Sequence, residues 1–353
     1  MKPKYPFKNL VFQGGGVKTF AYLGALEVLE AYEVLAQIDR TAGASAGAIM
    51  AMLVSFRLSA AEIGQLFNQI EFEKLPGLRS ARDILGTTSD FLDSHLTPLL
   101  ANADAINRLF NRFGWYATDY GYQWIQDTIA SQCDGNGRAT FGDFQKKGFG
   151  DLHVAVTDIS ARASRVFSFQ HTPEVAVADA LRMSVSIPLF FEALQFNGLE
   201  FGAGSYYADG GVLDNYPLHV FDHPDFQTGS RWHISGVNWE TLGCRLYTAG
   251  DCTTLIPRRP IHSLLDYIEA LLETVLEAQV VAFDHNKVDQ QRTININDHC
   301  VLATDFHVRP GSESTQYHDL VQSGREEAKA YLDGYVFPSH NLWQWAKRTW
   351  LRR

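Results

Sequence analysis

The stretch "TAGASAGAIMAML" (residues 41–53) surrounds one serine with glycines and alanines and then becomes almost wholly apolar. The segment before it, "VLAQIDRTAGAS" (34–45), predicts a short strand that ends at this serine. The segment after it, "AGAIMAMLVSF" (46–56), predicts an apolar helix. Ser45 therefore occupies a strand-to-helix turn, in the pattern G-x-S-x-G.

The same unit occurs once more, closer to the N-terminus. "NLVFQGGG" (9–16) is a short apolar run that ends in glycines, which is typical of a buried strand that stops at a tight turn. "VKTFAYLGALEVLEAYE" (17–33) has apolar residues at helical spacing. Two successive strand–turn–helix units favour a parallel sheet covered on both faces. The sequence therefore predicts a three-layer α/β/α fold with a mainly parallel central sheet.

The later segments extend this organisation to about residue 336. Residues 59–147 are expected to be mostly helical, and the apolar stripe of 261–287 predicts a long helix that packs on the domain. Further strands are predicted at "DLHVAVTDIS" (151–160), "SRVFSFQ" (164–170), "RTININ" (292–297) and "VLATDFHV" (301–308), and a final helix at 320–335. Because no repeat or linker interrupts the chain, we expect a single domain over 1–336, followed by a short tail, 337–353.

Composition and charge limit the function classes. The chain has 353 residues and a formal net charge of -10, which argues against general nucleic-acid binding because that needs a concentrated cationic face. No apolar stretch is long enough for a secretory signal or a membrane span, so a cytoplasmic location is expected. The spacing of the cysteines suits neither zinc nor a disulfide scaffold, and reduced thiols are expected at Cys133, Cys244, Cys252 and Cys300.

The glycine run Gly14-Gly15-Gly16 can bind negative charge. Consecutive glycines let backbone N–H groups point into one space at a helix N-terminus, where they can hold a phosphate or the oxyanion of an acyl-transfer intermediate. The spacing fits neither G-x-x-x-x-G-K-[ST] nor G-x-G-x-x-G. Taken by itself, this turn leaves anion binding and acyl transfer both open.

Two further features have a catalytic and a structural interpretation. Ser45, between Gly43 and Gly47, is either the nucleophile of a sharp elbow or a cap of the helix that begins at residue 46. Asp209, followed by Gly210-Gly211, is either a catalytic carboxylate or part of an ordinary Asx-type turn. Neither motif alone decides between its two interpretations.

Together, these motifs follow one another in a recognisable order: a glycine turn, an early G-x-S-x-G and a much later D-G-G. With "GGGVKTFAYLGALEVLE", "GASAGAI", "ALRMSVSIPLFF" and "DGGVLDNYP", the chain resembles the patatin-like phospholipase family over about residues 8 to 335. The resemblance implies a lipid acyl hydrolase that cleaves carboxylic-ester bonds of phospholipids or lysophospholipids and releases fatty acids. It also implies a serine–aspartate dyad without histidine, and no metal or organic cofactor.

Carried over position by position, the resemblance makes Ser45 the nucleophile and Asp209 the base. The backbone amides of Gly14, Gly15 and Gly16 form the oxyanion hole, and the residues that support the turns are Lys18, Gly43, Gly47, Gly210, Gly211, Asn215 and Pro217. Thr19 departs from the family pattern, which usually has glycine there. Because the base must accept a proton at neutral pH, burial is expected to raise the pKa of Asp209.

Two alternatives remain open from the residues. An α/β-hydrolase would use a Ser-His-Asp triad, with His285, His299 or His307 as the histidine, although its serine normally follows several strands. A non-catalytic module could instead use the glycine turn to bind an anionic ligand. The dyad residues would also support acyl transfer to an acceptor other than water.

The chain end and the helical region concern access to the substrate. In "HNLWQWAKRTWLRR" (340–353), Trp343, Trp345 and Trp350 fall on one broad helical face and most of the cations on the other. This pattern predicts either peripheral contact with a membrane surface or an ordinary terminal helix. Within the helical region 59–147, the segment 71–100 is where the resemblance is thinnest, and it is either a lid or acyl-channel wall or an ordinary helical insertion. The expected partners are a lipid ester and a membrane surface.

Overall fold

The computed structural model describes residues 5–75, 103–226, 232–249, 261, 264–311 and 314–336. The strands are β1 (Asn9–Phe12), β2 (Arg40–Ala44), β3 (Gly114–Tyr116), β4 (Asp151–Asp158), β5 (Ala163–Ser168), β6 (Leu189–Phe191), β7 (Leu194–Phe196), β8 (Ser205–Asp209), β9 (His233–Ile234), β10 (Val237–Asn238), β11 (Thr241–Tyr247) and β12 (Thr293–Asn297). The α-helices are α1 (Ala21–Ala31), α2 (Ala46–Ser55), α3 (Ala60–Phe67), α6 (Ala103–Arg112), α7 (Asp119–Gln132), α8 (Phe141–Lys146), α9 (Val177–Ser184), α10 (Gly211–Asp214), α11 (Leu264–Asp284), α12 (Lys287–Gln291) and α13 (Thr315–Asp333). Short 3₁₀ helices are η1 (Gly16–Phe20), η2 (Leu35–Gln37), η3 (Phe72–Lys74), η4 (Leu218–Asp222) and η5 (Pro224–Phe226).

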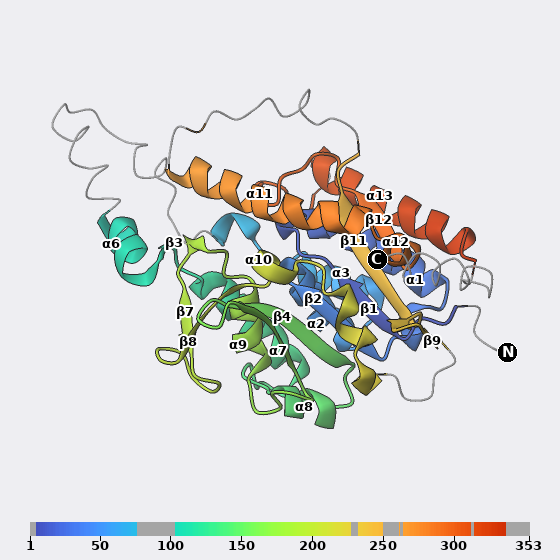
Figure 1. Ribbon diagram of the computed structural model, residues 1–353, viewed down its shortest axis with the longest axis horizontal. Coiled ribbons are helices and arrows are strands. Elements are labelled where there is room, and N and C mark those ends of the chain that lie inside the picture. Colours follow the sequence, from blue (N-terminus) through green and yellow to red (C-terminus); the bar gives the residue numbers. More distant parts are fainter. Residues whose placement is uncertain are drawn as a thin grey trace.

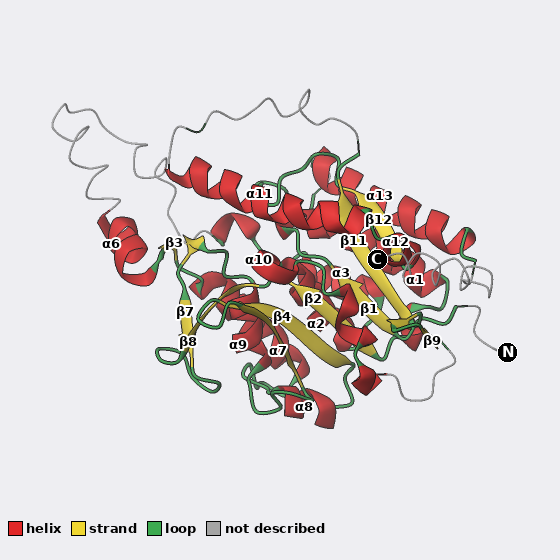
Figure 2. Ribbon diagram, in the orientation of Figure 1, coloured by secondary structure: helices red, strands yellow, loops and turns green. Residues whose placement is uncertain are grey.

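The centre of the fold is one sheet in the order β12-β11-β1-β2-β4-β8-β7, with β5 also paired to β4 (Figure 2). From β12 to β4 every pairing is parallel, whereas β5, β8 and β7 are antiparallel to their neighbours. The predicted α/β class with a mainly parallel sheet is confirmed. Because Phe12 pairs with Gly43, the turns that follow β1 and β2 lie at the same edge of the sheet.

Side chains of β1 alternate between the two faces of the sheet. Leu10 and Phe12 belong to the large hydrophobic core, to which α1, α2 and α13 also contribute. Val11 belongs to a smaller cluster on the other face, with Phe221 of η4. In Figure 1 α13 lies along α1 beside β12, which is where the N-terminal and C-terminal parts of the chain meet. This burial on both faces explains why β1 contains a continuous apolar run, Leu10–Phe12, rather than alternating polar residues.

Two parts of the sequence prediction for the sheet need correction. The alternating segment 301–308 was expected to be a strand but forms turns, in which Val301 and Val308 are buried and Asp305 N–H donates to the Leu302 carbonyl. Strands β7 and β11 were not predicted; β11 lies inside the sheet between β12 and β1, and Gly243 interrupts its apolar pattern. A Cβ at Gly243 would lie 1.7 Å from the hydroxyl oxygen of Tyr216, so the packing excludes any side chain there.

The expected helical region 59–147 is helical over most of its described residues. The exception is β3, which pairs in parallel with β6 and forms a separate two-stranded sheet. Residues 76–102 lie outside the described part, so the lid prediction stays untested there. Of the cysteines, Cys133 and Cys244 are free and buried, but Cys300 is disulfide-bonded, so the expectation of reduced thiols is wrong for Cys300.

A buried charge network joins η4, α12 and β12 on the side of the sheet opposite the large core. The side chain of Arg292 is 1% exposed, and its Nη2 lies 2.6 Å from Asp222 Oδ2 and 2.8 Å from Asp289 Oδ1. We expect Arg292→Leu to lower the free energy of unfolding by about 3–5 kcal/mol, because it removes the buried cation between the two carboxylates. Each carboxylate then still has the exposed His219 ring 2.9 Å away. Urea denaturation measures this change.

Arg325 supplies the matched control for this prediction. It pairs with Glu27 at 2.5 Å, but both side chains are more than 40% exposed. Arg325→Leu should therefore cost less than about 1 kcal/mol. Equal destabilisation by the two substitutions would contradict the assignment of the Arg292 network as a buried support of the fold.

Candidate active site

Ser45 has an unusual backbone conformation at the end of β2. It is the residue before α2, with φ 52° and ψ -134°, a left-handed region that a serine rarely adopts without a reason. Its side chain makes no capping hydrogen bond to the helix. The interpretation of Ser45 as a helix cap is therefore wrong, and the conformation is that of a sharp elbow that presents the hydroxyl group.

The elbow requires the glycines on either side of Ser45. A Cβ at Gly43 would lie 2.3 Å from the carbonyl oxygen of Gly47, and a Cβ at Gly47 would lie 2.5 Å from that of Gln13. Both distances are far below van der Waals contact with backbone atoms. The two glycines of G-x-S-x-G are thus fixed by the close approach of α2 to the ends of β1 and β2.

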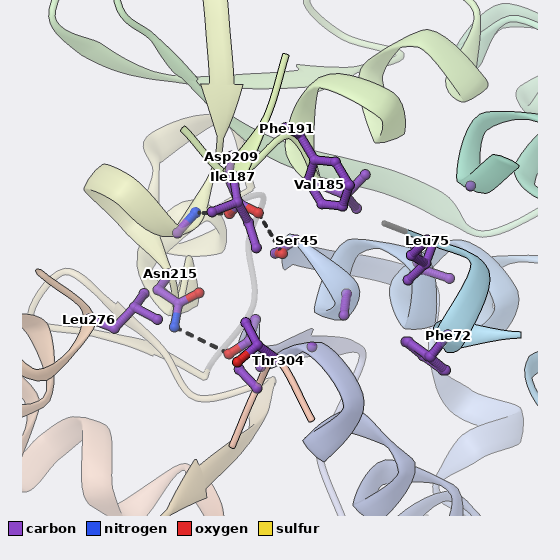
Figure 3. Close-up of a pocket in the computed structure, with 18 of the residues that line it drawn as sticks. Ser45, Phe72, Leu75, Val185, Ile187, Phe191, Asp209, Asn215, Leu276 and Thr304 are labelled. Atoms are coloured by element: carbon purple, nitrogen blue, oxygen red, sulfur yellow. Dashed lines mark hydrogen bonds between the residues drawn. The ribbon is translucent and has the colours of Figure 1, made fainter. Parts of the chain in front are cut away.

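Asp209 is the last residue of β8 and faces Ser45 directly. Ser45 Oγ donates a hydrogen bond to Asp209 Oδ2 at 2.7 Å, as Figure 3 shows. The other carboxylate oxygen accepts the backbone N–H of Gly211 at 2.6 Å. The residue is 5% exposed, and burial raises the pKa of Asp209 to about 7 against the opposing effect of these two hydrogen bonds. The pKa shift has the direction expected from the sequence.

Backbone contacts hold this aspartate in register with the sheet. The side-chain hydroxyl of Thr157 on β4 donates to the Asp209 carbonyl at 2.9 Å, and the Asp209 N–H donates to the Ser186 carbonyl at 2.8 Å. A Cβ at Gly210 would lie 2.3 Å from the Ala155 carbonyl oxygen. The first glycine of D-G-G is therefore needed for β8 to pass close to β4.

Ser184 is a positioning residue that the sequence did not reveal. It ends α9, its Oγ donates to the Ala155 carbonyl at 2.7 Å, and the same oxygen accepts the Ser45 N–H at 2.9 Å. It thereby ties the elbow to β4. Ser184 lies inside the quoted segment "ALRMSVSIPLFF", but a serine at a helix end has no distinctive pattern of its own.

The glycine turn lies beside Ser45, and its three backbone amides differ in whether they make a hydrogen bond. The Gly14 N–H donates to the Asn215 carbonyl at 3.0 Å, and Asn215 Nδ2 donates back to the Gly14 carbonyl at 3.2 Å. Within the described residues, no hydrogen bond occupies the amides of Gly15 and Gly16. Gly16 has φ +53°, and a Cβ there would lie 2.0 Å from the Ala303 carbonyl oxygen. Of the three predicted oxyanion donors, only Gly15 and Gly16 thus have unpaired amides.

Lys18 and Thr19 fix the turn from its far side. Lys18 Nζ lies 2.7 Å from Asp298 Oδ2, and the Asp298 side chain is 2% exposed. Thr19 is buried, and its hydroxyl donates to the Gly16 carbonyl at 2.6 Å. The threonine that departs from the family pattern is thus accommodated by a hydrogen bond within η1. Pro217, also expected to be structural, directly precedes η4.

An apolar cavity opens beside the two candidate catalytic side chains. Ser45 and Asp209 lie on its wall with the glycine turn. In Figure 3 Phe72 and Leu75 lie to one side of Ser45, Ile187 and Phe191 come from the segment that ends at β6, and Leu276 comes from α11. The prediction that the α11 segment only packs on the domain is incomplete: Ile268 is buried, but Leu276 lines the cavity and Leu271 is 44% exposed.

The alternative triad has no support in this geometry. None of the described residues that line the cavity is a histidine. His307, which was expected on a strand, lies in a turn, and His299 follows β12 at a left-handed φ of 51°. The described ranges also contain no group of three or more His, Cys, Asp or Glu side chains that could hold a metal ion.

The predicted membrane contacts at Trp343, Trp345 and Trp350 fall outside the described residues. Among the helices that are described, none is both long enough and apolar enough to cross a membrane. The prediction of peripheral contact through the tail 337–353 therefore stays a prediction.

Comparison with known proteins adds an independent finding. The family model described as patatin-like phospholipase matches residues 10–222. The protein YqhO of Bacillus subtilis (strain 168), described as uncharacterized, is 28% identical over 334 residues, which cover 93% of this chain and 98% of YqhO. The probable lipid hydrolase 463L of Invertebrate iridescent virus 6 is 24% identical over 220 residues, or 62% of this chain and 64% of that protein.

A solved structure agrees with the fold. VipD from Legionella pneumophila superposes with a TM-score of 0.54 at 17% identity, over 94% of this chain and 67% of VipD. At this identity the likeness concerns the fold alone. Because the family model spans more than half of the chain and includes the glycine turn, the serine elbow and the D-G-G turn, the chain belongs to the patatin-like phospholipase family.

Proposed function

We propose that this protein is a lipid acyl hydrolase that cleaves carboxylic-ester bonds of phospholipids or lysophospholipids through Ser45 and Asp209. The observation that carries the proposal is the 2.7 Å hydrogen bond from Ser45 Oγ to a buried carboxylate on the wall of an apolar cavity. Family membership and the name of the viral relative, a probable lipid hydrolase, support an ester of a lipid as the substrate.

The first half-reaction transfers the acyl group to the serine. Asp209 accepts the proton of Ser45 while Ser45 Oγ forms a bond to the ester carbonyl carbon. The tetrahedral intermediate carries its negative charge on the former carbonyl oxygen. When it collapses, the bond to the leaving alcohol breaks, and the alcohol takes the proton from Asp209. The product is an acyl-enzyme at Ser45.

The second half-reaction releases the fatty acid. A water molecule gives a proton to Asp209 as its oxygen attacks the acyl carbon, and the bond to Ser45 Oγ then breaks with return of that proton to the serine. One aspartate thus serves as base and acid in both halves. A pKa of about 7 suits this role, because the carboxyl group is then substantially ionised at neutral pH and still a competent proton donor.

The amides of Gly15 and Gly16 are the proposed oxyanion donors. They lie on the cavity wall beside Ser45, and neither has a hydrogen-bond partner among the described residues. The N-terminus of α2, which begins at Ala46, adds a favourable dipole on the same side. Because the Gly14 amide is paired with Asn215, we assign Gly14 to holding the turn rather than to contacting the substrate.

The same observations weigh against a module that binds a free anion. Such a site would need several unpaired amides and a cation, but the Gly14 amide is paired and Lys18 is engaged by Asp298. The remaining wall is mostly apolar. Apolar lining suits an acyl chain and disfavours a desolvated phosphate.

Product analysis in ¹⁸O-labelled water tests the proposal. Wild-type protein incubated with mixed phospholipid vesicles should release fatty acid that carries one ¹⁸O atom, detected by mass spectrometry. The Ser45→Ala variant should release none above background, whereas Ser131→Ala should behave like wild type, because the Ser131 hydroxyl bonds only to its neighbours Thr128 and Gln132 within the described part of α7 and lies outside the cavity wall. Acyl esters of another alcohol in place of labelled fatty acid would instead identify a transferase.

A further inference from the structure

The ionisable side chains that line the cavity are all acidic among the described residues. Of the described residues that line the cavity, only Asp209 and Glu273 have ionisable side chains, and none is lysine or arginine. Glu273 lies on α11 and is exposed. Within the described residues, no ion pair joins Glu273 to a cation. Among the described residues, Glu273 is thus a carboxylate on the cavity wall without a neighbouring cation.

The sequence of the helix that carries Glu273 is acidic. Helix α11 contains Asp266, Glu269, Glu273, Glu277 and Asp284, and no lysine or arginine. Asp284, at the C-terminal end of the helix, lies 3.2 Å from Arg245 Nη2. A carboxylate at the edge of an apolar, low-dielectric cavity gives a local negative potential, so Glu273 favours cationic groups there.

The cavity has two sides around Ser45, and Glu273 belongs to one of them. Figure 3 shows Phe72 and Leu75 on one side of Ser45 and Leu276 of α11 on the other. The first side continues into the buried Ile70 and suits an acyl chain. Glu273 precedes Leu276 by three residues and thus shares its helix face, which leaves the α11 side for the leaving group of the ester.

We propose that Glu273 selects lipid esters whose leaving headgroup carries an ammonium group over those with a net negative headgroup. The inference rests on the proposed hydrolase function, which makes the headgroup part of the leaving alcohol. A carboxylate attracts an ammonium group at the rim and repels a headgroup with unbalanced phosphate charge. Because Glu273 is exposed, the expected preference is about fivefold rather than several orders of magnitude.

Binding without turnover tests this inference. In the Ser45→Ala background, the Kd is measured for a lysophospholipid with a choline headgroup and for one with a glycerol headgroup, with the same acyl chain, as monomers at low salt. The choline lipid should bind about fivefold more tightly. Glu273→Gln should bring the two Kd values within about twofold of each other, and Glu273→Lys should reverse the order. High salt should reduce the preference.

Glu326→Lys is the matched control. Glu326 lies on α13, is exposed and does not line the cavity, and its replacement changes the net charge by the same amount as Glu273→Lys. The headgroup preference should persist in this variant. An unchanged preference in Glu273→Lys, or its loss in Glu326→Lys as well, would overturn the role of Glu273.

The binding assay also separates this inference from the proposed chemistry. A headgroup preference that depends on Glu273, in a wild-type protein that hydrolyses neither lipid, would contradict the hydrolase and leave the headgroup site standing. Hydrolysis of both lipids without such a preference would contradict the headgroup site and leave the hydrolase standing.

Discussion

Ser45→Ala is expected to lower kcat/KM for ester hydrolysis by about 10⁵-fold, the scale on which loss of a serine nucleophile acts. The substitution removes the only atom proposed to bond to the acyl carbon and leaves Asp209 and the glycine turn in place. A soluble short-chain ester and a phospholipid should show the same loss, since the acyl-enzyme is common to both. Discontinuous assays, in which samples are quenched at set times and the released fatty acid is quantified, measure the change.

The fold should survive the loss of this hydroxyl group. Ser45 Oγ makes no helix-capping bond. Its hydrogen bond to Asp209 can be lost at small cost, because a buried carboxyl group with a pKa of about 7 can take up a proton. Thermal unfolding of Ser45→Ala should therefore stay close to that of the wild type. Ser131→Ala again serves as the control and should keep full activity. Residual activity above about 1% of wild type would mean that another group is the nucleophile, since a retained oxyanion hole alone supports far less.

The part of the fold near the serine was predictable because local signals agree with the final packing. Strand β1 is largely apolar, β1 and β2 both end at turns rich in glycine and alanine, and α2 is buried along its whole length. The local sequence pattern and the tertiary packing therefore favour the same structure there. Gly243 in β11 breaks this agreement, because its reason is the distant Tyr216 side chain. The alternating pattern of 301–308 also gave a wrong prediction. Val301 and Val308 are buried, but they reach the core from turns and not from a strand.

The pairing of Ser45 with Asp209 depends on strand register, which single-sequence patterns do not contain. Ala44 pairs with Ala155 across β2 and β4, and Val156 pairs with Asp209 across β4 and β8. These registers bring together residues that are 164 positions apart. From the sequence, only the order of motifs and the family resemblance connected them. Ser184, which has no such motif, was missed.

Asp209 is expected to control the pH dependence of hydrolysis. Only the ionised carboxylate can take the proton of Ser45, so kcat/KM should fall as the pH drops through the folded-state pKa of about 7 and reach a plateau above it. Asp209→Asn cannot accept the proton and should lower kcat/KM by about 10³–10⁴-fold. It should also abolish the inflection near neutral pH in whatever activity remains.

Substitution of a histidine separates this assignment from the triad alternative. His307 lies in a turn and is not among the residues that line the cavity. His307→Gln should therefore retain both the activity and the fall of kcat/KM as the pH drops below about 7. If this pH-dependent fall of kcat/KM persisted in Asp209→Asn, or disappeared in His307→Gln, the base would be a histidine. Steady-state rates between pH 5 and 9 on a soluble ester distinguish these results.

The stability of Asp209→Asn separates a buried base from a merely structural aspartate. Burial raises the folded-state pKa to about 7, above the ordinary value near 4, so the native state binds more protons than the unfolded chain between these values. The wild-type free energy of unfolding should therefore fall as the pH rises from about 4 to 7, by about 1.4 kcal/mol for each unit of the shift. Asparagine is neutral and avoids this loss.

Asp209→Asn should accordingly be more stable than the wild type at pH 8 by about 2–4 kcal/mol, while the two proteins should differ little at pH 4. Urea denaturation at the two pH values measures the difference. An aspartate whose charge supports the fold would give the opposite sign, with the variant less stable at high pH. A gain of stability together with a loss of activity is the result expected of a desolvated base, because the ionised carboxylate is then kept for the reaction at the expense of the fold.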